Sequence, residues 1–492
     1  MKMLTARRLQ QAVVLLSLMV TLYVTANSQA YNYNSTKFST PIGLAPGSPA
    51  GSYVLSGFES VNIFNGSLNF QLPLARVGGR GSAGFTWTLP IQRKWEIDRY
   101  QLGCGGMNCW HYQYFPRSWT SSWQDSSPRL NGPGQMIGRQ AGDSPTQSVC
   151  GVRWWTTLTR LTFIAADGTE YEFRDKDSDG KPLPVENRCN NPGPPRGNVW
   201  VTSDGSAMTF ISDVPIYDNI IPVFDNKIRP SGYMLLPDGT RYRIENGNVK
   251  WIRDRNGNVV TIDIINQGNV STVATDSLGR KVTISNDSRT ITYDGFGGQD
   301  RVIQLNYGQL SNNLRAGYSQ YKYNQLFPNL YDCYFGCYYT PGPSGNEYYD
   351  TQVISSVTIP DGRQYKLYYN PYGELAAVEL PTGGRIEYDW DASPGTRAGG
   401  IVYTQDTQVP PGSFNPYKLA VHRRIVERRV YSDATTLETK TIYSGYTEDH
   451  KDAAGNLLSR VKHYFYGSPY PSLTQRGTDY SKWGDGKEVS LR

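Results

Sequence analysis

The segment Tyr233–Asp294 carries the clearest structural pattern in the chain, and it reads YMLLPDGTRYRIENGNVKWIRDRNGNVVTIDIINQGNVSTVATDSLGRKVTISNDSRTITYD. Glycines recur within it every eight to eleven residues, at positions 239, 247, 257, 268 and 279. The Asp-Gly and Asn-Gly dipeptides among them tolerate the positive φ that tight hairpin turns require. Between turns, apolar residues alternate with polar ones, as Tyr242 and Ile244 do with Arg241 and Arg243. A period of two between regular turns predicts short antiparallel strands joined as hairpins.

The same pattern returns in Val357–Trp390, which reads VTIPDGRQYKLYYNPYGELAAVELPTGGRIEYDW. Turn glycines stand there at 362, 373 and 383, and Ile386 and Tyr388 alternate with Arg385 and Glu387. A hairpin pair cannot bury its apolar face alone, so neighbouring hairpins have to supply the core. We therefore predict an all-β fold, in which an antiparallel hairpin ribbon forms a partial shell or a solenoid.

A degenerate repeat motif runs through both blocks. In the second it consists of Tyr369-Asn370-x-x-Gly373-x-Leu375, then Val378, Pro381, Gly383, Ile386 and Tyr388-Asp389. This motif resembles the RHS repeat, also called the YD repeat, and the segment 246–261 is similar. An upstream stretch with Asn65-Gly66 and Gly79-Arg80-Gly81 resembles the opening segment of RHS proteins. The resemblance implies a β-ribbon wound into a hollow shell, as in bacterial polymorphic toxins, insecticidal toxin complexes and teneurins.

The family's C-terminal core segment, its toxin and its self-cleavage motif are not seen in this sequence. We therefore expect either the N-terminal part of a longer polymorphic-toxin-like protein or a reduced cell-surface protein. The sequence does not distinguish between these two expectations.

The N-terminus has the features of a secretory signal peptide. Lys2, Arg7 and Arg8 precede the apolar run Val13–Val24, and Ser28-Gln29-Ala30 offers small residues for cleavage. The run is short for a membrane span, so we predict an exported protein, secreted or at the cell surface, with no membrane span after signal cleavage. The segments expected are a signal peptide at 1–30, an extended lead-in at 31–56, a Trp- and Cys-rich β domain at 57–215, a YD-repeat block at 216–307, a Tyr-rich insertion at 308–350, and a YD-repeat block with C-terminal hairpins at 351–492.

Charge argues against a nucleic-acid partner. The 492 residues include 49 basic and 43 acidic side chains, a net charge of +6, which is a small imbalance rather than a basic face. The chain also holds 36 Tyr and 11 Trp. We expect an unknown protein or glycan as partner, and the Tyr-rich insertion is either its aromatic surface or a loop packed on the shell.

Six cysteines in an exported chain favour disulfides over a metal site. No Cys-x-x-Cys pair is present, which disfavours zinc. Nearest-neighbour pairing is our prediction, with other connectivities left open, and it joins Cys104 to Cys109, Cys150 to Cys189, and Cys333 to Cys337.

One acidic segment matches the calcium-loop pattern D-x-D-x-D-G-x5-E. The residues that match are Asp175, Asp177, Asp179 and Glu186, with Gly180 at the glycine position. Oxygens at alternate positions can converge on one Ca²⁺, and Glu186 could close the site with both oxygens. Pro182 and Pro184 preclude the helix that follows in an EF-hand, so the predicted site is a loop between strands. A solvated acidic turn is the alternative.

No catalytic motif stands out. Asp389 and Asp391 share a strand face and could serve a glycosidase, but Asp389 belongs to the repeat signature, so a structural role is favoured. The basic run at 422–424 with Arg428 and Arg429 indicates a solvated strand rather than a polyanion site.

We predict a non-enzymatic shell or scaffold with no catalytic residue and no cofactor other than Ca²⁺. The alternatives are a carbohydrate-binding or adhesion module that uses aromatic loops, and a glycan-acting enzyme on a β-propeller or β-helix.

Overall fold

A computed structural model describes most of the chain after residue 51. The described residues are 52–56, 58–78, 80–103, 110–120, 130–148, 151–166, 169–175, 195–202, 205–217, 228–267, 269–330, 343–405, 417–465 and 488–491. The chain divides into two compact units, Met1–Pro46 and Gly47–Arg492, and all described residues belong to the second. The predicted signal peptide and all six cysteines lie outside the described residues. The boundaries predicted inside the second unit stay a prediction.

Strands dominate the described residues, as predicted for an all-β fold. The short helical elements there are α2 (Tyr323–Leu326), η2 (Phe296–Gly298), η3 (Leu310–Asn312), η4 (Pro328–Leu330) and η5 (Ala398–Gly400). None of the helices in the described part is long and apolar enough to cross a membrane.

Two four-stranded sheets accompany the main sheet. One contains β1 (Ser52–Ser56), β2 (Glu59–Asn62), β3 (Leu68–Val77) and β4 (Phe85–Pro90), and the other contains β24 (Ile401–Gln405), β25 (Tyr417–Val421), β5 (Arg93–Gly103) and β6 (Trp110–Thr120). The second of these joins strands from opposite ends of the chain, through the pair Ala420 and Glu96.

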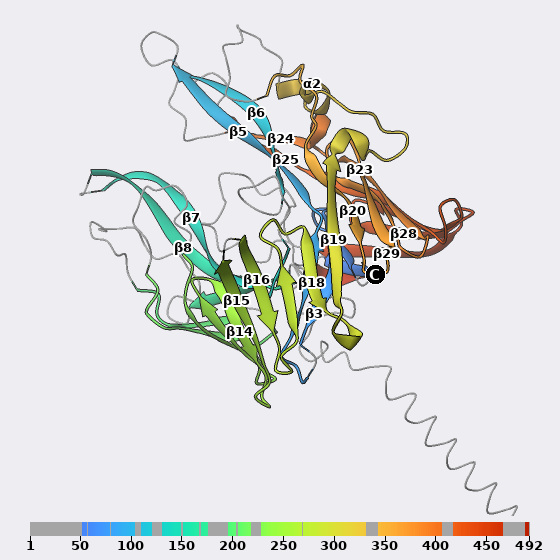
Figure 1. Cartoon of the computed structure of the whole chain (residues 1–492). Coiled ribbons are helices and arrows are strands. Elements are labelled where there is room, and N and C mark those ends of the chain that lie inside the picture. Colours follow the sequence, from blue (N-terminus) through green and yellow to red (C-terminus); the bar gives the residue numbers. More distant parts are fainter. Residues whose placement is uncertain are drawn as a thin grey trace, which may run out of the picture. The chain divides into compact units, whose positions relative to one another are not determined.

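The main sheet is an antiparallel meander. Its strands are β7 (Gln135–Ser148), β8 (Gly151–Ile164), β9 (Glu170–Asp175), β10 (Val199–Thr202), β11 (Thr209–Ser212), β12 (Gly232–Leu235), β13 (Arg241–Glu245), β14 (Asn248–Arg253), β15 (Val259–Gln267), β16 (Asn269–Thr275), β17 (Lys281–Ile284), β18 (Thr290–Asp294), β19 (Asp300–Gln309), β20 (Gln352–Thr358), β21 (Gln364–Tyr369), β22 (Leu375–Glu379), β23 (Arg385–Ala392), β26 (Arg423–Tyr431), β27 (Leu437–Ser444), β28 (Thr447–Asp452), β29 (Leu457–Phe465) and β30 (Glu488–Leu491). From β7 to β23 each strand pairs with the next, and β23 then pairs with β26. Figure 1 shows β14, β15 and β16 side by side, and β18 beside β19. The antiparallel hairpins predicted over 233–294 and 357–390 are confirmed.

The start of the meander closes on itself. Asn248 in β14 pairs with Gln135 in β7, which makes β7 to β14 a closed eight-stranded barrel. Beside this pair, the Met136 N–H donates to the Gly247 carbonyl at 2.6 Å. The far end of β14 pairs with β15, so the meander continues out of the barrel. The sequence predicted a ribbon but not this closure, because the closing pair joins residues far apart in the chain.

A five-residue turn that begins with Asp or Asn recurs between strands. The N–H of its first residue donates to the carbonyl of the fifth, and the glycine at the fourth position donates back to the first carbonyl. The first side chain also accepts the N–H of the fifth residue, at 2.8–3.1 Å. The turns of this kind are Asp254–Asn258, Asp276–Arg280, Asn370–Glu374 and Asp452–Asn456.

The predicted turn glycines adopt the expected backbone. Positive φ is found at Gly239, Gly247, Gly257, Gly279, Gly362, Gly373 and Gly383, and Gly268 lies outside the described residues. In the Asn246-Gly247 turn both residues have positive φ, 47° and 79°. Positive φ at both central positions defines the two-residue turn that best matches the twist of a hairpin.

One hydrophobic core runs through the sheets. Met234, Ile244 and Ile252 from the meander belong to it, as do Phe70 and Leu72 from β3. All five are at most 1% exposed. Full burial of such a side chain contributes roughly 1.5–3 kcal/mol, so the segment before the meander is an integral part of the core.

Candidate functional site

The opening segment 58–90 contacts the first repeat block through Gly81. The Ser82 N–H donates to the Asp254 carboxylate at 3.2 Å, and the Ser82 and Thr240 hydroxyls lie 3.2 Å apart. A Cβ at Gly81 would overlap the Asp254 carboxylate, and Gly81 has a φ of +69°. Glycine at this position therefore lets the opening segment touch the turn between β14 and β15.

The same segment contacts the second block at its other end. The Ile425 N–H donates to the Gly66 carbonyl at 3.0 Å, and a Cβ at Gly66 would overlap the Cβ of Arg424. Beside this contact, Glu59 accepts hydrogen bonds from the Tyr388 hydroxyl and the Arg428 guanidinium. The opening segment thus joins two blocks that are well separated in sequence, and we call this set of contacts the clasp.

The Glu59 cluster is buried. Glu59 is 3% exposed and Tyr388 is fully buried. Burial and the neighbouring Glu59 carboxylate raise the pKa of Tyr388 well above its ordinary value. Burial opposes the charge on Arg428, but Glu59 outweighs it and raises the pKa of that guanidinium. Tyr388 therefore stays a neutral hydrogen-bond donor and Arg428 stays charged.

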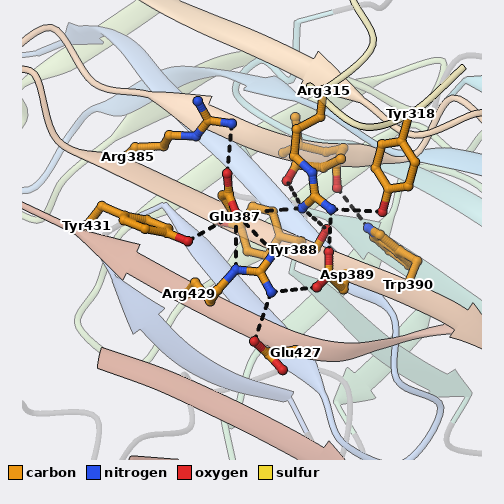
Figure 2. A network of polar contacts seen from close by, with 12 residues as sticks. Arg315, Tyr318, Arg385, Glu387, Tyr388, Asp389, Trp390, Glu427, Arg429 and Tyr431 are labelled. Carbon is orange, nitrogen blue, oxygen red and sulfur yellow. Dashed lines mark hydrogen bonds and ion pairs between the residues drawn. The ribbon is translucent and has the colours of Figure 1, made fainter. Parts of the chain in front are cut away.

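A second polar network lies on the face of β23 and β26 that points away from the Glu59 cluster, and Figure 2 shows it. Arg429 lies opposite Glu387 in the strand register. Its guanidinium contacts Glu387 at 3.0 Å, Asp389 at 2.6 Å and Glu427 at 2.8 Å. Arg385 completes this side by contacting the other oxygen of Glu387 at 2.7 Å.

Arg315, from the insertion between β19 and β20, enters the same network (Figure 2). It contacts Asp389 at 2.5 Å and donates to the carbonyl of Tyr388 at 3.2 Å. Its guanidinium also lies 4.7 Å over the ring of Tyr318. Burial raises the pKa of Asp389, but Arg429 and Arg315 outweigh it and hold that pKa below its ordinary value. The insertion is thereby fixed to the ribbon through a charged strand face.

The interpretation of the basic run as a solvated strand is wrong. The side chains of Arg423, Arg428 and Arg429 are only 8%, 12% and 18% exposed, and each is ion-paired with a carboxylate. Three of the partners come from other segments, because Glu59 lies on β2, Glu374 in the turn before β22 and Glu387 on β23. Arg385 also contacts Glu379 at 3.5 Å, and Lys366 contacts Glu379 at 3.4 Å, so the network on the second face holds four cations and four carboxylates and its charges balance.

Two of the described tyrosines of the insertion, Tyr323 and Tyr349, pack against Trp95. Tyr349 is 2% exposed, and its ring lies 4.7 Å from that of Trp95. Tyr323 packs against both of these rings. Tyr321 and Tyr348 are exposed. The packing of Tyr323 and Tyr349 agrees with a loop held on the shell, and the exposure of Tyr321 and Tyr348 agrees with an aromatic surface, so both expectations stay predictions.

Only one residue of the predicted calcium loop falls within the described residues. Asp175 ends β9, is 1% exposed and forms an ion pair with Arg196 at 3.1 Å. Asp177, Asp179 and Glu186 lie outside the described residues. Within the described ranges, no group of three or more His, Cys, Asp or Glu is placed to hold a metal ion.

Asp389 and Asp391, the candidate carboxylate pair on β23, lie in different environments. Asp389 is held by two arginines, whereas Asp391 is exposed and accepts the Ala392 N–H at 2.7 Å. This arrangement agrees with a structural role for Asp389. Sequence reasoning missed Glu59 and Arg315, since neither stands in a motif, and the only signal at this site was the Tyr-Asp repeat signature.

No protein-family model and no curated protein matches the chain. A solved structure of a Photorhabdus luminescens Tc holotoxin pore aligns with 84% of this chain and 23% of that chain, at 9% sequence identity and a TM-score of 0.16. The chain thus spans less than a quarter of that protein's length. At this TM-score the alignment does not establish a shared fold.

Proposed function

We propose that this protein is an exported, non-enzymatic scaffold of the RHS/YD-repeat type, whose hairpin ribbon forms part of a shell. The observation that carries the proposal is the long antiparallel meander with its recurring Asx-x-x-Gly turn. The resemblance of those turns to YD repeats, and of 57–90 to an RHS opening segment, supports the assignment. A longer polymorphic-toxin-like protein or a cell-surface protein would both use such a scaffold.

The charge arrangement supports a structural role. The arginines and carboxylates around β23 and β26 neutralise one another and cross-link strands, the insertion and the opening segment. A catalytic carboxylate or base needs access to a substrate, and Glu59 and Tyr388 lie in the core. The clasp is accordingly suited to holding the ribbon in a curved form.

Export and disulfides are parts of the same proposal. In the β5–β6 hairpin, Gly103 pairs with Trp110, and these residues flank Cys104 and Cys109. The register of the flanking strands favours the pairing of those two cysteines. Disulfides form in the oxidising compartments that exported chains reach.

The test is to express the full chain with its N-terminal segment in a bacterial host and analyse the exported fraction. We expect the intact mass to fit cleavage after Ala30 and three disulfides, and electron microscopy of the purified protein to show a hollow, curved particle. A cytosolic, uncleaved chain would contradict export. Release of reducing sugar from polysaccharides, lost in Asp391→Asn, would instead support the glycan-acting enzyme.

A further inference from the structure

Four Asn-Gly dipeptides occur in the sequence, and they begin at Asn65, Asn131, Asn246 and Asn256. An asparagine loses its side-chain amide when the backbone nitrogen of the next residue attacks it. Glycine leaves that nitrogen unhindered, because it has no Cβ. The reaction needs a side-chain amide that is free to turn and a backbone nitrogen that is free to meet it. These two requirements divide the four dipeptides.

Side-chain hydrogen bonds hold the first two asparagines. The Asn65 Oδ1 accepts the Ser67 N–H at 2.9 Å and the Ser67 hydroxyl at 2.7 Å. The Asn131 Nδ2 donates to the Gln71 side chain at 2.9 Å. Both amides have to break these bonds before they can turn toward the glycine that follows them.

Burial protects the third dipeptide. Gly247 is buried, and its N–H donates to the Pro230 carbonyl at 2.9 Å. A Cβ built on Gly247 would lie 2.6 Å from the Met136 carbonyl oxygen, so the main chain of β7 crowds this glycine. Attack of the Gly247 nitrogen on the Asn246 side chain therefore requires a buried hydrogen bond beside the barrel closure to break.

Asn256 is the least restrained of the four. Asn256 and Gly257 are exposed, and no hydrogen bond within the described part of the chain involves the Asn256 side-chain amide. The Gly257 N–H donates to the Asp254 carbonyl at 3.1 Å, but this bond closes an exposed turn, and exposed turns open at a low cost. Apart from the adjoining residues, a Cβ built on Gly257 would have one atom within 4 Å, the Arg253 Nη2 at 3.8 Å.

We propose that Asn256 is a site of spontaneous deamidation, and that its product weakens the end of the clasp at the first block. The Gly257 nitrogen attacks the Asn256 Cγ and a C–N bond forms. The side-chain amide nitrogen leaves as ammonia and takes up the proton of the Gly257 nitrogen. One water molecule then opens the succinimide ring at either carbonyl, which gives aspartate or isoaspartate. The reaction needs only water, and the proposal is independent of the scaffold function.

The product matters because Asp254 anchors one end of the clasp. Its carboxylate accepts two N–H groups of its own turn at 2.9 Å and the Ser82 N–H at 3.2 Å. Isoaspartate adds a carbon atom to the backbone of this turn, so both N–H groups cannot keep their places on the carboxylate. Arg253 and Arg255 are exposed beside the turn and offset the new negative charge. The longer backbone, rather than the charge, is therefore what loosens the contact.

The experiment incubates the full exported chain at mildly alkaline pH and follows the four dipeptides by peptide mapping with mass spectrometry. We expect Asn256 to convert at least about tenfold faster than the other three, since breaking one further contact already slows a reaction by about that factor. The same incubation in urea is the control. There the four sites should convert at similar rates, because they share the dipeptide and have lost the structure that separates them.

Asn256→Gln is the matched variant, because glutamine keeps the amide but has to close a larger ring and reacts more slowly. Ageing should lower the urea midpoint of the parent and leave that of Asn256→Gln unchanged. Asn256→Asp, measured fresh, adds the charge without the longer backbone and should unfold at the midpoint of the fresh parent.

The proposal is overturned if another Asn-Gly dipeptide converts first in the folded chain, or if Asn256 persists there while the chain in urea converts. It is also overturned if the aged parent and the aged Asn256→Gln variant lose stability equally. A fresh Asn256→Asp variant as unstable as the aged parent would refute the role of the longer backbone.

Discussion

At the scale of single residues, Glu59 is the most consequential charge of the clasp. Its carboxylate is buried and faces the Arg428 guanidinium and the Tyr388 hydroxyl. Removing one partner of a buried ion pair leaves the other charge uncompensated. The same carboxylate also joins the opening segment to β23 and β26, so its loss affects two parts of the molecule.

We predict that Glu59→Gln lowers the free energy of unfolding by about 3–5 kcal/mol. The amide can still accept from Tyr388, but it no longer balances the charge of Arg428. Urea titration followed by tryptophan fluorescence measures the loss. Glu438→Gln, at an exposed position, should stay within about 0.5 kcal/mol of the parent. Equal stability of the two variants would show that the buried pair contributes nothing.

A second residue-scale prediction concerns calcium. If Asp177, Asp179 and Glu186 bind Ca²⁺, the ion stabilises the folded chain by about 2.7 kcal/mol at a hundredfold excess over Kd. Calcium should then raise the melting temperature, and Asp177→Ala should abolish that increase. Asp175 is held by Arg196, so Asp175→Ala should destabilise the protein even without calcium. An unchanged melt in millimolar calcium would leave the acidic turn as the correct interpretation.

At the scale of elements, the sequence predicted strands and turns well because their contacts are local. The Asp254 turn is closed by bonds that span four residues, and the period-two pattern marks which face of β13 or β15 is buried. The contacts between elements that are distant in sequence could not be predicted in the same way. Arg428 meets Glu59 across 369 positions and Asp254 meets Ser82 across 172. No local pattern encodes a contact of that range, so the barrel closure and the clasp could not be predicted from the sequence and are seen only in the structure.

Alanine substitutions at two glycines separate the contact between the opening segment and the Asp254 turn from the effect of backbone strain. Gly81 and Gly279 both have positive φ, but a Cβ at Gly81 meets Asp254, whereas one at Gly279 meets nothing within 4 Å. We predict that Gly279→Ala costs about 1–2 kcal/mol from backbone strain alone, and that Gly81→Ala costs more. Chemical denaturation of both variants provides the measurement. Equal losses would mean that the close approach of Gly81 does not stabilise the fold.

The turn Ser432–Thr436 between β26 and β27 should make the free energy of unfolding depend on pH in the acidic range. Hydrogen bonds from the Thr435 and Thr436 N–H groups lower the pKa of Asp433 from 3.8 to about 2. A carboxyl whose pKa is lower in the folded state stabilises it above the ordinary pKa. That contribution is lost as pH falls from about 4 through about 2. Asp433→Asn should therefore flatten the pH dependence of the urea midpoint in this window. Parallel curves for parent and Asp433→Asn would refute the assignment.

At the scale of the whole molecule, the clasp sets how the ribbon unfolds. A meander in which each strand pairs with its sequence neighbours resembles a one-dimensional array, and long arrays of this kind can lose cooperativity. The opening segment counters this by touching Asp254 in the first block and Arg428 in the second. It also contributes Phe70 and Leu72 to the shared core.

A substitution that disrupts one end of the clasp should consequently lower the local stability of the other block. We predict that Gly81→Ala, which alters only the contact with the first block, increases amide hydrogen exchange in β23 and β26 of the second. Gly279→Ala is the control, since a Cβ added at this turn of the first block meets no atom within 4 Å. It should raise exchange near its own turn and leave β23 and β26 protected. Unchanged exchange at β23 and β26 in Gly81→Ala would mean that the two blocks are stabilised independently. The opening segment would then be a strand pair packed on the ribbon rather than the element that couples its two halves.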